Sequence, residues 1–167
     1  MSDPGASHLP VLQHIGRTIS VKRVVEYGCG LYSTLEFLRV ETFPVLEQLI
    51  SYEDDVTWAR RIALATPDLR LTLLPVEPGM FCMQEIPVGF DLAFVDSSTA
   101  DSRVAMLPRL RGRVQFVVLH DYDGPQAYRD ACELWPYRLV HRGGKPQTAI
   151  MSMEPFPAEL VAGWGQI

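Results

Sequence analysis

Short apolar runs alternate with amphipathic segments along almost the whole chain. Apolar residues at positions 11, 12, 15 and 19 have the spacing of one helix face, which predicts a helix over residues 9–19. The apolar runs predict strands at residues 24–27, 46–52, 69–76, 91–95, 114–119, 137–141 and 148–153. The segments between them predict helices at residues 34–40, 56–65, 103–110 and 125–132, and the acids Glu53, Asp54 and Asp55 are predicted to cap the second of these.

This alternation of strand and helix indicates an α/β protein. Near-continuous apolar strands are typical of a mostly parallel sheet that helices cover on both faces, which makes a three-layer sandwich. The last two strands flank a glycine-containing turn and predict an antiparallel hairpin at one edge. We therefore expect a single domain over residues 21–153. A helical lid segment at residues 1–20 precedes it, and a tail at residues 154–167 packs on the same domain.

The composition of the 167 residues, 47% hydrophobic and 21% charged, is that of a soluble globular protein. No apolar run approaches the ~20 residues of a membrane span, so we expect no membrane partner. The start lacks the basic and apolar regions of a signal peptide. Cys29, Cys82 and Cys132 are odd in number and widely spaced, which is typical of reduced thiols in a cytoplasmic protein.

The net charge of −5 argues against nucleic acid as a general partner, because phosphate binding requires clustered cations. One local basic cluster, residues 103–113, is interleaved with leucines. We interpret it as a solvated helix face.

The motif that most strongly indicates a ligand site is Glu26-Tyr27-Gly28-Cys29-Gly30, at the end of the first predicted strand. Only glycine lets a chain turn this sharply and lets a ligand lie against the backbone, so a side chain at either glycine should occupy the ligand's space. The next helix opens at Ser33 and Thr34, and its free N–H groups suit an anionic group. Ser33 and Glu36 fit a capping box. The pattern indicates a nucleotide-like cofactor held in an open α/β sheet.

Four predicted strands end in an acid: Glu26, Glu53, Asp96 and Asp121. The carboxyl ends of parallel strands share one edge of the sheet, where ligands bind at the reversal of strand order. A single acid at a strand end is an ordinary turn or cap residue. Four acids at one edge favour a binding site instead.

These residues resemble the class I S-adenosylmethionine-dependent methyltransferases. The resemblance covers roughly residues 20–153. Within the family, the motif is similar to that of a bacterial and phage subgroup of small members. It runs through Glu26-Tyr27-Gly28-Cys29-Gly30, Ser51-Tyr52-Glu53, Phe94-Val95-Asp96 and Val118-Leu119-His120-Asp121. It implies a Rossmann-like, seven-stranded sheet whose last strand is reversed, in agreement with the hairpin. Tyr32 replaces the family's common third glycine, and Ser33 counts against a dinucleotide motif.

The resemblance also implies roles for individual residues. Glu26 and the glycine turn face the methionine moiety, Glu53 takes the ribose hydroxyls, Glu77 lies on the adenine side, and Asp96 lies beside the sulfonium. The implied cofactor-binding set is Glu26, Tyr27, Gly28, Cys29, Gly30, Ser33, Thr34, Glu53, Asp54, Glu77 and Asp96. Alternatively, Tyr27 and Cys29 only pack the turn, and Trp58 either flanks the adenine or belongs to the core.

For the chemical step we expect Asp96, His120 and Asp121 to converge beside the transferable methyl group. Histidine suits a general base near neutral pH, although a strand-end histidine is also commonly bonded to a neighbouring loop. Some catechol-type relatives instead hold Mg²⁺, and Asp96, Asp121 and Asp123 offer oxygen ligands for it. Tyr122 stands where those relatives have an asparagine.

The resulting prediction is methyl transfer from S-adenosylmethionine to the oxygen or nitrogen of a small-molecule acceptor. The alternatives are a non-catalytic binder of the cofactor on a degenerate methyltransferase fold and, less favoured, an NAD-dependent oxidoreductase. The sequence is also compatible with a homodimer.

Overall fold

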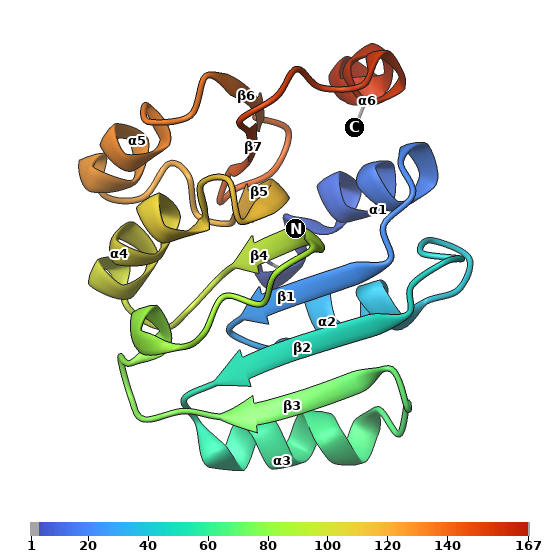
Figure 1. Cartoon of the computed structure of the whole chain (residues 1–167), viewed down its shortest axis with the longest axis vertical. Helices are drawn as coiled ribbons and strands as arrows, with labels where there is room; N and C mark the ends of the chain where they lie inside the picture. The colour runs from blue at the N-terminus through green and yellow to red at the C-terminus, as the bar shows by residue number, and fades with distance from the viewer. Residues whose placement is uncertain (1–3, 167) are drawn as a thin grey trace.

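The protein is built on one seven-stranded sheet with the strand order β3-β2-β1-β4-β5-β7-β6 (Figure 1). The computed structural model describes residues 4–166. The strands are β1 (Arg23–Tyr27), β2 (Gln48–Glu53), β3 (Leu71–Pro75), β4 (Phe90–Val95), β5 (Val114–Leu119), β6 (Tyr137–His141) and β7 (Thr148–Ser152). The first five are parallel to one another, while β7 is antiparallel to both β5 and β6. The predicted Rossmann-like fold, with its antiparallel edge hairpin, is confirmed.

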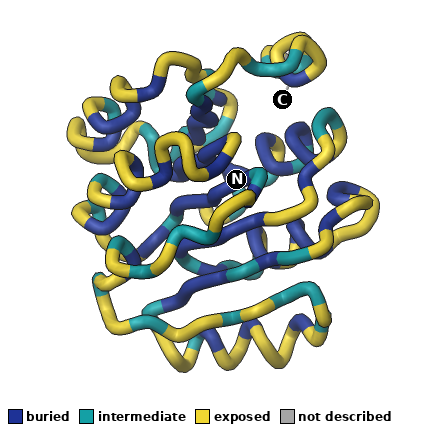
Figure 2. The backbone as a smooth tube through the Cα atoms, in the orientation of Figure 1, coloured by how far each residue is buried: buried dark blue, intermediate teal, exposed yellow. Residues whose placement is uncertain are grey.

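Helices cover both faces of this sheet. They are α1 (Leu9–Thr18), α2 (Ser33–Leu38), α3 (Val56–Ala65), α4 (Ala100–Leu110), α5 (Gln126–Cys132) and α6 (Ala158–Gly163), with 3-10 turns η1 (Pro4–Ala6), η2 (Phe81–Met83) and η3 (Trp164–Gln166). Side chains alternate across each strand, so Val24 packs with α1, α2 and α6 while Val25 packs with α4, α5 and η2. The central strands are accordingly buried on both sides (Figure 2).

Both ends of the described chain pack on the body of the protein. Helix α1 contacts α2 and α6, and His14 Nε2 donates to the Leu160 carbonyl oxygen at 2.7 Å. In the tail, the Phe156 ring stacks on Phe116 with 6.1 Å between centroids. The segment before α1 is therefore fixed close to the central strands. No helix among residues 4–166 is long and apolar enough to cross a bilayer.

Of two predicted helix caps, one is present in the structure and the other is not. Asp55 caps α3 as predicted, accepting from the backbone N–H groups of Thr57 and Trp58 at 2.8 and 3.0 Å. The predicted capping box of Ser33 and Glu36 at the start of α2 is not formed. That helix begins without a side-chain cap, and Glu36 instead accepts from Thr42 Oγ1 at 2.6 Å. Glu36 is buried and turned away from the helix start.

Candidate cofactor and acceptor site

The strand order reverses between β1 and β4, and a pocket lies where these two strands end. Its volume is about 270 Å³. The residues around it come from the N-terminal segment, the glycine turn, α3 and the end of β4: Gly5, His8, Gly30, Leu31, Tyr32, Ser33, Trp58 and Asp96. A crevice at a strand-order reversal is the usual ligand site of an open α/β sheet.

Gly28 is required by the packing of the strands. Its φ is +96°, and a Cβ at this position would lie 2.5 Å from the backbone oxygen of Asp96. The turn is fixed on both sides, because Gly28 N donates to Tyr52 O and Asp96 N donates to Tyr27 O, each at 2.9 Å. A side chain here would collide with the backbone just after β4, so the fold itself requires glycine at this position. That it would also fill the ligand's space stays a prediction.

Gly30 differs from Gly28, because it lines the pocket. A Cβ on Gly30 would meet Ser33 Oγ at 3.2 Å and no backbone atom closer than 3.9 Å. A side chain on Gly30 would therefore reduce the space for a ligand.

Glu26 is fully buried beside the glycine turn. Its Oε2 accepts from Thr34 Oγ1 at 2.7 Å and from Ser51 Oγ at 2.6 Å, while Oε1 has no hydrogen-bond partner among the described residues. Burial raises the pKa of Glu26 to about 7, against the opposing effect of the neighbouring hydroxyls. A buried carboxyl with one unpaired oxygen is suited to a ligand that carries a donor.

Replacing Glu26 with glutamine should remove a pH dependence of stability. The folded-state pKa of about 7 exceeds the ordinary value of 4.5, so the folded protein holds a proton between these values that the unfolded chain has released. Stability should therefore fall by about 3 kcal/mol as the pH rises through this window and stay low above it. Urea denaturation from pH 4.5 to 8 should show this fall in the wild type and a smaller one in Glu26→Gln.

A matched control for this experiment is Glu36→Gln. Glu36 is equally buried, but its carboxylate has Arg39 at 3.3 Å and a hydroxyl donor. This variant should keep the wild-type pH dependence. Identical pH profiles for Glu26→Gln and the wild type would mean that Glu26 is ionised across the whole window.

Glu53 holds the far side of the glycine turn. Its Oε2 accepts from Cys29 N at 2.8 Å and its Oε1 from Asp55 N at 2.9 Å. Trp58 Nε1 donates to the Cys29 carbonyl oxygen at 2.8 Å, so the same residue is fixed from both directions. Burial raises the pKa of Glu53. Each of its oxygens retains a second lone pair with which it could bind a diol.

The other residues of the implied cofactor set lie in different surroundings. Tyr27 is buried in the core and stacks on Tyr52 with 5.5 Å between ring centroids, so its side chain packs the sheet. Asp54 Oδ2 accepts from Ser98 Oγ at 2.6 Å and from Gly79 N at 3.2 Å, which ties neighbouring loops together. Glu77 is exposed. None of the three lines the pocket.

Beside the ends of β4 and β5, the structure adds Arg103 to the strand-end acids. Its guanidinium lies 2.9 Å from Asp96 Oδ1 and 2.5 Å from Asp121 Oδ2, and it also donates to the Ser97 carbonyl oxygen at 2.6 Å. Arg103 is buried, so the interpretation of residues 103–113 as a solvated face is wrong at this position.

The spacing within α4 contained a signal for this burial. Met106, Leu107 and Leu110 follow position 103 at intervals of three, four and seven residues and are all buried. Arg103 is thus the one charged member of an apolar stripe. Arg109, Arg111 and Arg113 are exposed, as expected.

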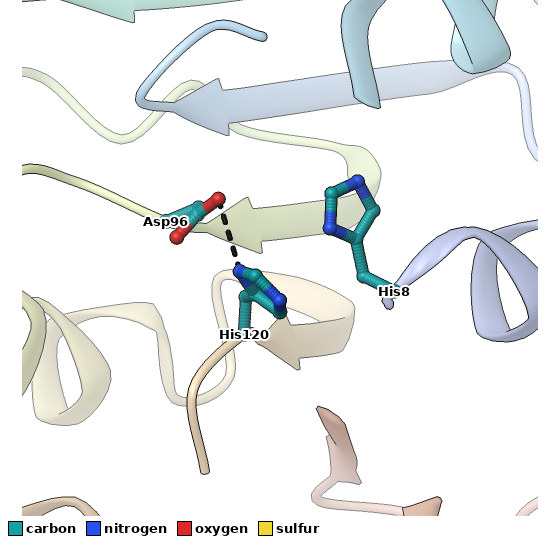
Figure 3. Close-up of side chains that lie close together, drawn as sticks. All are labelled: His8, Asp96 and His120. Atoms are coloured by element: carbon teal, nitrogen blue, oxygen red, sulfur yellow. Dashed lines mark ion pairs between the residues drawn. The ribbon is translucent and has the colours of Figure 1, made fainter. Parts of the chain in front are cut away.

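His120 contacts both an acid and the N-terminal segment. Its Nδ1 is 3.2 Å from Asp96 Oδ2 and 3.7 Å from Asp121 Oδ1, and its Nε2 shares a hydrogen bond of 2.9 Å with Ser7 Oγ. The predicted convergence of Asp96, His120 and Asp121 is thus present in the geometry. No sequence pattern indicated Ser7 or His8. The His8 ring lies beside that of His120, with 4.7 Å between ring centroids (Figure 3).

The three carboxylates that were predicted as Mg²⁺ ligands do not converge like Asp96, His120 and Asp121. Arg103 already bridges Asp96 and Asp121 with a positive charge, and Asp123 Oδ1 accepts from Gln147 N at 2.6 Å. Among the described residues, these three carboxylates do not bring one oxygen each within reach of a common ion. The residues Asp96, Asp121 and Asp123 therefore do not fit Mg²⁺.

Comparison with known proteins identifies the fold. The sequence matches no family model and no curated protein. The structure is similar to a candidate caffeoyl-CoA O-methyltransferase from Staphylococcus aureus, with 14% identity, a TM-score of 0.66, and coverage of 86% of this chain and 81% of the other. A candidate rRNA methylase from Clostridium thermocellum matches with 11% identity, a TM-score of 0.65 and coverage of 90% and 97%.

A third similar structure is that of PigF with SAH. It has 11% identity, a TM-score of 0.59 and coverage of 90% of this chain, which spans 54% of PigF. At these identities the similarity defines the class of fold, that of the class I methyltransferases, and not the reaction.

Proposed function

We propose that the protein transfers a methyl group from S-adenosylmethionine to the oxygen or nitrogen of a small molecule. The observation that carries the proposal is the pocket at the strand-order reversal, which has the glycine turn on one side and Asp96 on the other. The similarity to methyltransferase structures, one of them with SAH, supports it. The bacterial and phage subgroup, a cytoplasmic location and a homodimer stay predictions from the sequence.

Residues that line the pocket, Trp58 and Asp96, and two carboxylates that flank the glycine turn without lining the pocket, Glu26 and Glu53, fit this cofactor. Glu26 Oε1 is buried and unpaired, so it can accept from an ammonium group. Glu53 has lone pairs for two ribose hydroxyls and is held rigidly by two backbone donors. Trp58 presents an aromatic surface to the pocket. Asp96 adds a negative charge, which favours the cationic cofactor over its neutral product.

When bound, the cofactor supplies a methyl group on a positively charged sulfur. The protein's contribution is alignment of the acceptor, which can supply several kcal/mol of the barrier, up to about 7–11 in the best cases. Asp96 lines the pocket, with His120 directly behind it. In the metal-free protein, the acceptor's proton would move toward this Asp96–His120 pair as the new bond forms.

Calorimetric titration separates this function from its alternatives. We expect S-adenosylmethionine and S-adenosylhomocysteine to bind and NAD not to bind. Because Glu26 has a pKa of about 7, an ammonium beside it should favour the charged form, and binding at neutral pH should release protons. If S-adenosylmethionine binds but no acceptor of a broad panel is methylated, the alternative of a non-catalytic cofactor binder is favoured. Binding of NAD alone would overturn the proposal.

Replacing Glu53 with glutamine should weaken S-adenosylhomocysteine by about 2 kcal/mol, or roughly 30-fold, because two charge-assisted hydrogen bonds to the ribose become neutral ones. Glutamine is preferred to alanine because it keeps an oxygen for one of the two backbone donors that hold the turn. Glu47→Gln is the control, since Glu47 is exposed and pairs with Lys22 at 3.2 Å. Unchanged affinity in folded Glu53→Gln would remove the ribose assignment.

A further inference from the structure

Two histidines and one carboxylate converge at the inner end of the pocket. His8 precedes α1, Asp96 follows β4 and His120 follows β5, so the cluster joins three distant parts of the chain (Figure 3). One ligand atom from each lies within 4.8 Å of the other two. Within residues 4–166, no other three histidine, cysteine or acidic side chains come together in this way.

Both nitrogens of His8 are buried without a hydrogen bond. Neither has a partner among the described residues, although His8 is only 2% exposed. His120 Nδ1 faces the carboxylates of Asp96 and Asp121 at 3.2 and 3.7 Å. The His8 ring packs on Phe94, with 5.0 Å between centroids, where an apolar side chain would pack without loss. Burying an unpaired polar group costs about 1–3 kcal/mol, so the two unpaired nitrogens of His8 indicate that this side chain has a ligand.

The remaining contacts orient two of the three side chains. His120 is held through Nε2 by Ser7 Oγ at 2.9 Å, and Asp96 is held through Oδ1 by Arg103 at 2.9 Å. The atoms left over, His120 Nδ1 and Asp96 Oδ2, face each other at 3.2 Å. Two ligands that each lie about 2.1 Å from one ion are separated by roughly this distance. Outer partners that fix metal ligands in this manner are usual at metal sites.

Charge and access also suit a cation. Asp96 and Asp121 carry two negative charges against the single positive charge of Arg103, which leaves the region net negative. His8 and Asp96 both line the pocket, so an ion can reach them, and positions on its outer side would face a bound substrate.

We propose that His8, Asp96 and His120 bind a divalent first-row transition metal such as Zn²⁺ or Fe²⁺. Two imidazoles and one carboxylate suit these ions, whereas Mg²⁺ and Ca²⁺ prefer oxygen ligands. This set differs from the oxygen-rich set of Asp96, Asp121 and Asp123. If the proposed function holds, the metal would polarise the acceptor's heteroatom in the pocket; metal binding itself does not depend on that function.

The test is Co²⁺ titration of the 167-residue chain after chelator treatment, with binding followed by visible absorption. We expect saturation at one equivalent and displacement by Zn²⁺ but not by excess Mg²⁺. Zn²⁺ should also raise the melting temperature, because it binds only the folded protein. His8→Phe, His8→Gln and His120→Gln should each weaken binding by about 100-fold or more. His8→Phe keeps the packing on Phe94 while removing both nitrogens.

His141→Gln is the matched control, because His141 is a buried histidine outside the cluster, at the end of β6. It should bind Co²⁺ like the wild type. Weak binding, displacement by Mg²⁺, a thiolate charge-transfer band, or full binding by folded His8→Phe would each overturn the proposal. Titration with S-adenosylhomocysteine is scored separately: its loss with metal binding intact would overturn the proposed function alone.

Discussion

Replacing Gly28 with alanine is expected to destabilise the folded protein by about 2–5 kcal/mol. The residue has a φ of +96°, where a side chain alone costs about 1–2 kcal/mol. The added Cβ would also lie 2.5 Å from Asp96 O and 2.8 Å from Asp96 C, and neither atom can move without displacing the end of β4. Overpacking of this kind adds about 1–3 kcal/mol. Urea denaturation with circular dichroism measures the loss.

Gly112→Ala separates the two contributions. Gly112 also has a positive φ, +66°, but a Cβ there would meet nothing within 4 Å. This variant should lose only about 1–2 kcal/mol, the conformational part alone. Equal losses in the two variants would mean that the contact with β4 is unimportant. A Gly28→Ala protein that kept its stability and lost only ligand binding would favour the ligand-space explanation instead.

Most of the fold could be predicted because its signals are local. Strand β5 and helix α3 have the predicted bounds, since an uninterrupted apolar run and an Asp cap are both readable within a few residues. The predicted start of β2 at position 46 was too early. Leu46 N donates to Phe43 O at 3.3 Å in a turn, and pairing with β1 begins at Gln48. Apolar side chains in a buried turn look the same in sequence as those in a strand.

The candidate site was predictable only in part, for a related reason. Parallel strands bring their carboxyl ends to one edge, so the acids there could be placed from topology alone. The partners of these acids come from elsewhere. Ser7 is 113 residues from His120 in sequence, and no local pattern connects them. Likewise, the predicted capping box does not form, because Glu36 pairs instead with the buried Thr42 and the exposed Arg39 just after its own helix.

Replacing Arg103 with methionine is expected to destabilise the protein by about 3 kcal/mol. Methionine fills similar space on the buried stripe of α4 but leaves Asp96 and Asp121 without their shared cation. Removing one partner of a buried ion pair typically costs about 3–5 kcal/mol. The lower end applies, because the side chains of Asp96 and Asp121 are 25% and 34% exposed and water can screen them. Urea denaturation at pH 7 measures the effect.

Arg111→Met is the control, because Arg111 ends the same helix and is exposed, so its loss should change stability by less than about 0.5 kcal/mol. Combining Arg103→Met with Asp121→Asn should recover part of the loss, since one uncompensated charge is then removed. A double-mutant cycle measures that recovery as a coupling energy. No coupling, together with a small effect of Arg103→Met alone, would mean that water replaces the guanidinium between the two carboxylates. Arg103 would then be one more solvated residue of the basic cluster, as the sequence first indicated.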